Sequence, residues 1–303
     1  VYFMEGIIEK SSSNHKLVLD NYCKLIICHE EILSRIVKCF IDEAKHLTLN
    51  EIERLIKEKK SFHHLDKENF IPYSGKTNYD FLCTIDLSQR IYLNVEIQND
   101  PNPGYSLITR GLTYISRIMT TQWKNEYYDY DYNHIKKVYS IWILPQSAKK
   151  NDGHINAYKI DEININGTTI ERIETYDKGV LIMIYLNKEH DTNEKYIIYD
   201  NILTPLVAFL NNVLSYQEKR KIMKEYGFKE IEKEVREVCD YANILEKEYL
   251  NKGIGIGVEK GIEQGTQNER IKNIRKLMIK LKMSFKEAIQ FLDIPEDEVK
   301  EIE

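Results

Sequence analysis

The segment 79–98, YDFLCTIDLSQRIYLNVEIQ, alternates between apolar and polar residues and is interrupted once by a polar stretch at 86–90. Alternation with a period of two is typical of a β-strand, and a short polar interruption is typical of a hairpin turn. The segment therefore predicts two antiparallel strands. This hairpin constrains the fold of the chain more than any other stretch.

Three polar side chains lie near the open end of the predicted hairpin, namely Asp80, Glu96 and Gln98. Glu96 and Gln98 share one face of the second strand, because side chains two residues apart point the same way. Two carboxylates directed at one point repel each other unless a cation lies between them, and an all-oxygen site suits Mg²⁺ or Mn²⁺. Asp80 and Glu96 are therefore candidate metal ligands for phosphodiester cleavage.

At these residues the sequence resembles the PD-(D/E)xK nuclease superfamily. Within it, the sequence resembles the bacterial transposase-associated, recombination-promoting nuclease (Rpn-like) group, which has Glu-x-Gln where the parent motif has Glu-x-Lys. Asp80, Glu96 and Gln98 stand at the three motif positions, although no Pro precedes Asp80. The helix that follows also matches the group, at Arg110, Tyr114, Ser116 and Arg117.

The resemblance implies an α/β fold, a restriction-endonuclease-like mixed sheet flanked by helices. It also implies a Mg²⁺- or Mn²⁺-dependent DNA endonuclease associated with transposition or recombination, with the metal held by Asp80 and Glu96. The catalytic residues implied by the match are Asp80, Glu96, Gln98, Arg110 and Tyr114.

Other acids stay open as metal ligands. Asp86 is the alternative to Asp80, but it falls in the turn at the far end of the predicted hairpin, so we prefer Asp80. Glu30 and Glu31 lie in an amphipathic helix predicted over 17–47, with one break allowed, and nucleases of the resembled superfamily often take a further acid from the helix before the strands. Either acid reaches the metal, or both lie on a solvated face.

The predicted helix at about 106–123 has Arg110, Tyr114 and Arg117 at positions i, i+4 and i+7, on one face. These side chains either hold a phosphate backbone or order the acidic strand, and the simpler alternative is a solvated face with one packed Tyr. Arg110 is expected to stabilise negative charge in the transition state. Gln98 does not titrate near neutral pH, so it is expected to orient a water molecule or a phosphate oxygen.

Two near-continuous apolar runs, at 138–144 and 180–186, predict strands buried on both faces of a sheet. The polar stretch between them carries Asn-Asp-Gly and Asn-Gly turn signals, which predict an extra hairpin. With the predicted helices, these strands indicate a mixed sheet flanked by helices, and we assign residues 1–215 to this nuclease-like domain.

The remaining part, 216–303, is predicted to be a helical extension with a Gly-rich connector at about 251–267. Within the connector, glycines recur every four residues at Gly253, Gly257, Gly261 and Gly265. No strand precedes them, so a phosphate-binding loop is disfavoured, and they predict a flexible or weakly helical connector. The alternative is a small-residue face for close helix contact, and the C-terminal helices are the expected surface for a homo-oligomer.

Charge gives limited information about partners. The formal net charge of −5 gives no global support for nucleic-acid binding, so local charge must supply it. Between residues 270 and 286 there are seven cations and no acid, and these side chains either touch DNA phosphates or form a solvated or partner-binding face. The seven are Arg270, Lys272, Arg275, Lys276, Lys280, Lys282 and Lys286.

Composition also bears on location. The five cysteines are scattered through apolar segments, which indicates reduced thiols. No apolar run reaches the roughly 18 residues that a membrane span needs, and no secretory leader is evident. We therefore expect a cytoplasmic protein without membrane association.

Two other functions remain open. One is a catalytically inactive protein that keeps the nuclease fold for DNA binding or oligomerisation, and the other is a solute-binding or structural α/β protein whose acids are merely exposed. Binding of Mg²⁺ or Mn²⁺ separates the enzyme from both alternatives, because the enzyme needs it.

Overall fold

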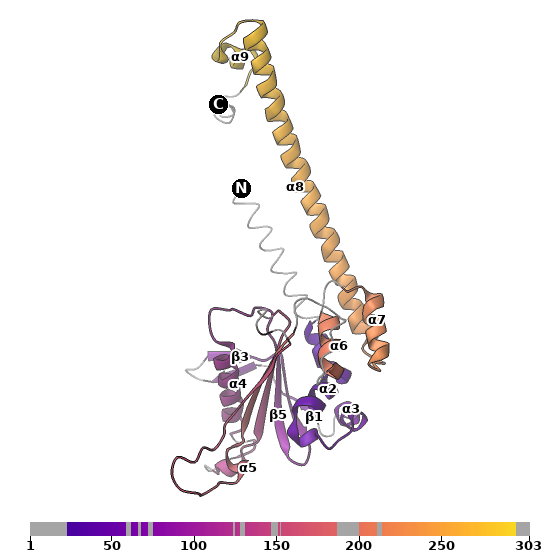
Figure 1. The fold of residues 1–303 in the computed structure, drawn as a ribbon, viewed down its shortest axis with the longest axis vertical. Helices are drawn as coiled ribbons and strands as arrows, with labels where there is room; N and C mark the ends of the chain where they lie inside the picture. Colours follow the sequence, from indigo (N-terminus) through magenta and orange to yellow (C-terminus); the bar gives the residue numbers. More distant parts are fainter. Residues whose placement is uncertain are drawn as a thin grey trace. The chain divides into compact units, whose positions relative to one another are not determined.

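A computed structural model of the chain forms two compact units, residues 1–242 and 243–303 (Figure 1). The domain boundary predicted from the sequence lies at 215/216. Within these units the structure describes residues 23–58, 62–65, 68–71, 75–123, 125–127, 131–146, 151, 153–186, 200–210 and 214–294.

The first unit is built on a mixed sheet, which among the described residues has six strands in the order β1-β4-β5-β6-β8-β7. β5, β6 and β8 are parallel, whereas β4 runs antiparallel to β5 and the two edge strands are antiparallel to their neighbours. The strands are β1 Phe62–His64, β4 Phe81–Asp86, β5 Arg90–Ile97, β6 Lys137–Leu144, β7 Ile155–Lys159 and β8 Gly179–Tyr185. A separate antiparallel pair is formed by β2 Glu68–Ile71 and β3 Gly75–Asn78.

The helices belong to both units, and α8 begins in the first and ends in the second. They are α2 Glu30–Phe40, η1 Asp42–Ala44, α3 Leu49–Glu58, α4 Leu107–Thr121, η2 Tyr132–His134, α5 Ile173–Tyr176, α6 Asp200–Leu210, α7 Tyr216–Glu225, α8 Glu232–Lys280 and α9 Phe285–Phe291. Among the described helices, none contains an apolar stretch long enough to cross a membrane.

The predicted hairpin is confirmed as β4 and β5. Asp86 pairs with Arg90 next to the turn, and Phe81 pairs with Val95 near the open end. The two apolar runs form β6 and β8, as predicted. The predicted extra hairpin differs, because β7 pairs with β8 itself, whereas residues 160–172 form no helix or strand.

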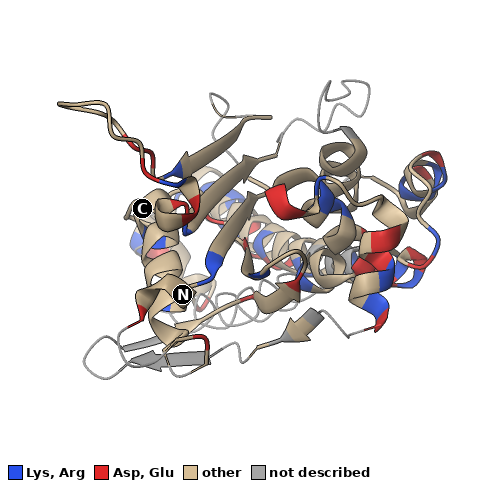
Figure 2. Cartoon of the chain, turned by 90° about the horizontal axis from the view of Figure 1, so that it is seen from below, with Lys and Arg blue, Asp and Glu red and all other residues tan. Residues whose placement is uncertain are grey.

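Alternate side chains of the strands pack on opposite faces of the sheet. On one face Leu82, Tyr92 and Trp142 pack with Tyr114 and other residues of α4. On the other face, the odd-numbered residues of β4, β5 and β6 belong to a larger core that includes α2, α3 and α6. Figure 1 shows α4 on one side of the sheet and these three helices on the other, and the strands carry few charged residues along their length (Figure 2).

Two glycines let α4 lie close to the sheet. A Cβ at Gly111 would come within 2.5 Å of Leu181, and a Cβ at Gly179 would come within 2.8 Å of Ile115. Contacts this short require neighbouring side chains to move, so both positions favour Gly. Because neither glycine has a side chain, α4 packs closely against the sheet, and the polar residues of α4 come near β5 and β6.

The N-terminal and C-terminal helices differ in part from the sequence prediction. The helix predicted over 17–47, with one break allowed, is broken at His29, whose imidazole caps α2 by accepting a hydrogen bond from the backbone of Glu31. It ends at Phe40, and its residues 17–22 lie outside the described residues. The Gly-rich stretch, expected to be a flexible or weakly helical connector, lies within the continuous helix α8. A Cβ at Gly253 or Gly265 would meet no atom within 4 Å.

Candidate active site

Asp80 and Glu96 meet at the open end of the β4–β5 hairpin, as the sequence predicted. The backbone N–H of Asp80 donates to Oε1 of Glu96 at 3.1 Å, and Asp80 Oδ2 accepts a hydrogen bond from the N–H of Ile97 at 2.9 Å. Each acid is thus held by the strand that carries the other. Glu96 is only 3% exposed, whereas Asp80 lies at the edge of the cluster and is partly exposed.

The environment of Glu96 disfavours its negative charge. Burial, with the nearby charge of Asp80 as the second cause, raises the pKa of Glu96 to about 8. The backbone hydrogen bond from Asp80 and the charges of Arg110 and Lys24 act in the opposite direction. A buried carboxyl beside a second acid is stabilised as an anion when a further cation binds there.

Lys24 supplies a positive charge that the sequence analysis missed. Its Nζ lies 3.0 Å from Oδ1 of Asp80, and it comes from the helical residues 23–28. Lys24 and Asp80 are far apart in the sequence, so periodicity gives no indication of their contact. The one available signal was a Lys next to the apolar run Leu25-Ile26-Ile27.

Asn94 is a second residue that the sequence analysis missed. It is completely buried on the same face of β5 as Glu96. With its amide nitrogen facing Glu96, Asn94 donates to Glu96 Oε1 at 2.9 Å and to the carbonyl of Phe81 at 3.0 Å, while its oxygen accepts from the Ser140 hydroxyl at 3.0 Å. Ser140 in turn accepts from Nε1 of Trp142 at 2.9 Å. A buried chain of hydrogen bonds therefore ends on the candidate ligand Glu96.

Arg110 and Tyr114 of α4 lie over the end of β5. The Arg110 guanidinium donates to the Tyr114 hydroxyl through Nη2 at 2.7 Å and Nε at 3.2 Å, and to Gln98 Oε1 through Nη1 at 3.3 Å. The amide nitrogen of Gln98 donates to the carbonyl of Asp100 at 2.7 Å. Of the two roles expected for Arg110, these contacts match the ordering of the acidic strand.

Two other residues of the sequence analysis lie away from the acid pair. Asp86 is at the turn end of the hairpin, where its Oδ1 lies 2.6 Å from Nε of Arg90. Asp86 is therefore not part of the acid pair. Arg117 donates from Nη1 to the Thr77 hydroxyl.

The two acids of α2 lie in different environments. The carboxylate of Glu31 is buried and accepts three backbone hydrogen bonds, from Lys229 at 2.7 Å and from Glu230 and Ile231 at 3.0 Å each. Glu31 therefore fixes the residues that lead into α8, and both of its carboxylate oxygens accept hydrogen bonds from them. Glu30 is partly exposed in the first turn of α2.

The donor set can be compared with the needs of a metal ion. Within the part of the chain that the structure describes, no group of three or more His, Cys, Asp or Glu side chains is arranged to hold a metal. Asp80 and Glu96 form a two-carboxylate set, and the amide oxygen of Gln98 accepts a hydrogen bond from Arg110. Mg²⁺ is commonly bound through one or two carboxylates, with water and substrate phosphates completing the shell, so the residues present fit Mg²⁺ or Mn²⁺.

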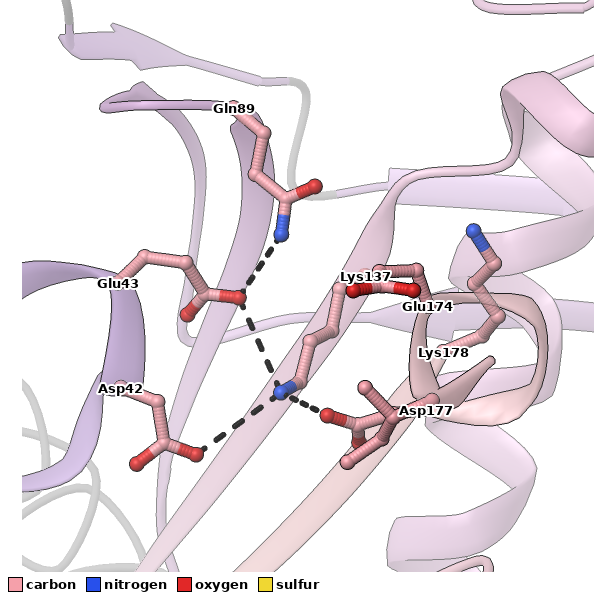
Figure 3. A pocket seen from close by; sticks show the side chains of 8 residues that line it. Asp42, Glu43, Gln89, Lys137, Glu174, Asp177 and Lys178 are labelled. Atoms are coloured by element: carbon pink, nitrogen blue, oxygen red, sulfur yellow. Dashed lines mark hydrogen bonds and ion pairs between the residues drawn. The ribbon is translucent and has the colours of Figure 1, made fainter. Parts of the chain in front are cut away.

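A second polar cluster surrounds Lys137 in a hollow of about 380 Å³ (Figure 3). Lys137 is 6% exposed, and its Nζ lies 2.5 Å from Asp177, 3.8 Å from Glu43 and 3.9 Å from Asp42. Gln89 donates a hydrogen bond to Glu43 at 3.1 Å. The ammonium group of Lys137 is shared by three carboxylates, so the cluster joins η1, β6 and the end of α5 as an ionic clamp.

The clamp and the acid pair lie at opposite ends of the sheet. In the pairing of β5 with β6, Lys137 stands beside Ile91, whereas Trp142 stands beside Glu96. The clamp is therefore a separate feature from the candidate active site.

Comparisons with family models, with curated proteins and with solved structures gave no match to this chain. The α/β class of the first unit, with its mixed sheet between helices, follows from the structure itself.

Proposed function

We propose that the first unit is a restriction-endonuclease-like, metal-dependent endonuclease that hydrolyses phosphodiester bonds in DNA. The observation that carries this proposal is the pair of acids at the open end of the hairpin, joined by the hydrogen bond from Asp80 to Glu96 and flanked by Lys24 and Arg110. Asp80 and Glu96 would hold Mg²⁺ or Mn²⁺. A divalent ion bound there supplies Lewis acidity, which polarises the scissile phosphate and lowers the pKa of the attacking water.

The residues around the acids have distinct roles in this proposal. Asn94 fixes the orientation of Glu96 from within the core. Arg110, positioned by Tyr114, presents positive charge near the developing negative charge on the phosphate. Gln98 orients water or a phosphate oxygen, since its amide does not titrate near neutral pH.

Nicking of supercoiled plasmid DNA with Mg²⁺ tests the proposal. We expect Asp80→Asn and Glu96→Gln each to lower the nicking rate by about 100-fold or more, because a lost ligand removes several kcal/mol of charge stabilisation. Asp86→Asn is the matched control at the other end of the hairpin and should retain the wild-type rate. Equal activity in all three variants would remove the acid pair from the mechanism, and RNA of the same length, added as competitor, tests the preference for DNA.

One observation favours a second candidate, a catalytically silent protein that uses the same fold to bind DNA or to oligomerise. Lys24 already forms an ion pair with Asp80, and Gln98 carries no charge. Calorimetric titration with Mn²⁺ separates the two candidates. The enzyme binds Mn²⁺ through Asp80 and Glu96, whereas the silent protein gives no binding that depends on these acids.

A further inference from the structure

The C-terminal part of α8 separates its charged residues from its buried face. Ile274 is 2% exposed, so its side of the helix is covered. At about 100° per residue, Lys272, Arg275 and Lys276 lie between about 100° and 200° around the helix from Ile274, and Lys280 lies at about 240°. All four side chains are exposed. The cations therefore form one face opposite the covered side.

This basic face of α8, defined by Lys272, Arg275, Lys276 and Lys280, lines a hollow of about 460 Å³ together with Asn268, Ile271 and Ile279. Residues 270–286 contain no acid, in a chain whose formal net charge is −5. Among the described residues, none of the four cations has a carboxylate within ion-pair distance. Glu269 lies three residues before Lys272 on the same side of the helix, so the face carries four cations beside one acid, and its net positive charge is complementary to a polyanion.

We propose that the basic face of α8 binds the phosphate backbone of duplex DNA. This inference rests on the proposed function and assigns a second DNA contact, separate from the acid pair. Three of the cations recur every four residues and so are spaced by about 6 Å along the helix axis. Duplex DNA presents phosphates continuously along both strands, and Asn268 adds an amide donor for a phosphate oxygen.

An anionic membrane is the other polyanion that a basic helix can meet. A helix that lies in a membrane interface inserts an exposed apolar face opposite its cations. Here Ile274, at the centre of the side opposite the cations, is buried, and the most exposed apolar side chain of this stretch, Ile279, lies among the cations and not opposite them. This arrangement favours DNA.

Fluorescence anisotropy with a labelled duplex, measured in EDTA at several salt concentrations, tests the proposal. The test variant replaces all four residues of the basic face by Gln. If each contacts one phosphate, the slope of log affinity against log salt should decrease in magnitude by about 3.6. Between about 50 and 200 mM salt the wild-type affinity should then fall about 100-fold more than that of the variant.

The matched control replaces four exposed lysines of the first unit by Gln, namely Lys221, Lys224, Lys229 and Lys233. The control should keep the wild-type slope. An equal decrease in both variants would show a general charge effect and overturn the proposal, as would binding to phosphatidylserine vesicles without binding to the duplex. Circular dichroism checks that both variants keep the wild-type helix content.

The two proposals fail in different ways because this assay contains no metal. If the wild-type chain cleaves plasmid DNA and the test variant keeps the wild-type slope, the proposal for the basic face is wrong and the nuclease proposal is supported. If the test variant loses the salt-dependent binding and the wild type never cleaves, the proposal for the basic face is supported and the nuclease proposal is wrong.

Discussion

The backbone of Asp80 donates a hydrogen bond to the side chain of Glu96, so the positions of the two acids depend on each other. Asp80 in turn accepts from the residue that follows Glu96. The acid pair is therefore part of the hairpin ladder. Substitutions around it should change both the chemistry of the site and the stability of the first unit.

The pH dependence of stability should report the burial of Glu96. In the folded, metal-free protein the pKa of Glu96 is raised to about 8 from an ordinary value of 4.5. Its contribution to stability is complete below pH 4.5 and is lost as the pH rises to 8, because the folded state binds the proton more tightly. The stability advantage of Glu96→Gln over the wild type should therefore grow from pH 4.5 upward and reach on the order of 5 kcal/mol near pH 8.

Urea unfolding in EDTA at several pH values measures this difference. The exposed substitution Glu174→Gln is the control and should follow the wild-type curve. A constant difference between Glu96→Gln and the wild type across the range would contradict the raised pKa.

Lys24 should affect metal binding and nicking in opposite directions. Its ammonium group neutralises Asp80 and repels a divalent ion, so Lys24→Gln should increase the affinity for Mn²⁺ about tenfold, or ~1.4 kcal/mol. The nicking rate at saturating Mn²⁺ should decrease, because a positive charge near the phosphate is lost. Lys24→Arg should restore the rate. Weaker Mn²⁺ binding in Lys24→Gln would show that Lys24 supports the site only structurally.

Asn94 should couple energetically to Ser140. Asn94→Leu removes the side-chain donor to Glu96 and to the Phe81 carbonyl in the core, so it should destabilise the first unit by about 1–3 kcal/mol. Ser140→Ala removes the next link of the same chain of hydrogen bonds. A double-mutant cycle by urea unfolding should give an interaction energy of about 0.5–3 kcal/mol. Additive effects would show that the two residues act independently.

Lys137 should contribute strongly to stability. Lys137→Met leaves Glu43 and Asp177 without their shared cation in a largely buried cluster, so we expect a loss of about 3–5 kcal/mol. Lys159→Met removes an exposed partner of Asp42 and should cost about 1 kcal/mol or less. Thermal or urea unfolding compares the two variants, and similar small losses in both would contradict the ionic clamp.

The sequence predicted the features that depend on local periodicity. The alternation in segment 79–98 placed β4, β5 and their turn, and the spacing of Arg110 and Tyr114 placed both on one face of α4. Proximity of Asp80 to Glu96 followed from the hairpin, because its register is set by neighbouring residues.

Features that depend on contacts distant in the sequence were not predictable in this way. Lys24 reaches Asp80 only after the N-terminal helix packs on the sheet, and Glu31 finds its three donors about 200 residues further along the chain. Asn94 was indistinguishable from an exposed strand residue until Ser140 and Trp142 covered it. The helical state of the Gly-rich stretch runs against the low helix propensity of Gly.

The alternation of side chains along β5 limits how this protein can change. Asn94, Glu96 and Gln98 share a face, while Leu93, Val95 and Ile97 fill the core behind it. Deleting a single residue inside the strand would turn Glu96 toward the apolar core and the aliphatic side chains toward the side of the acid pair. Length variation among relatives should therefore accumulate in the 87–89 turn and spare the strand, since the same alternation of side chains determines both the packing of the core and the position of the acids.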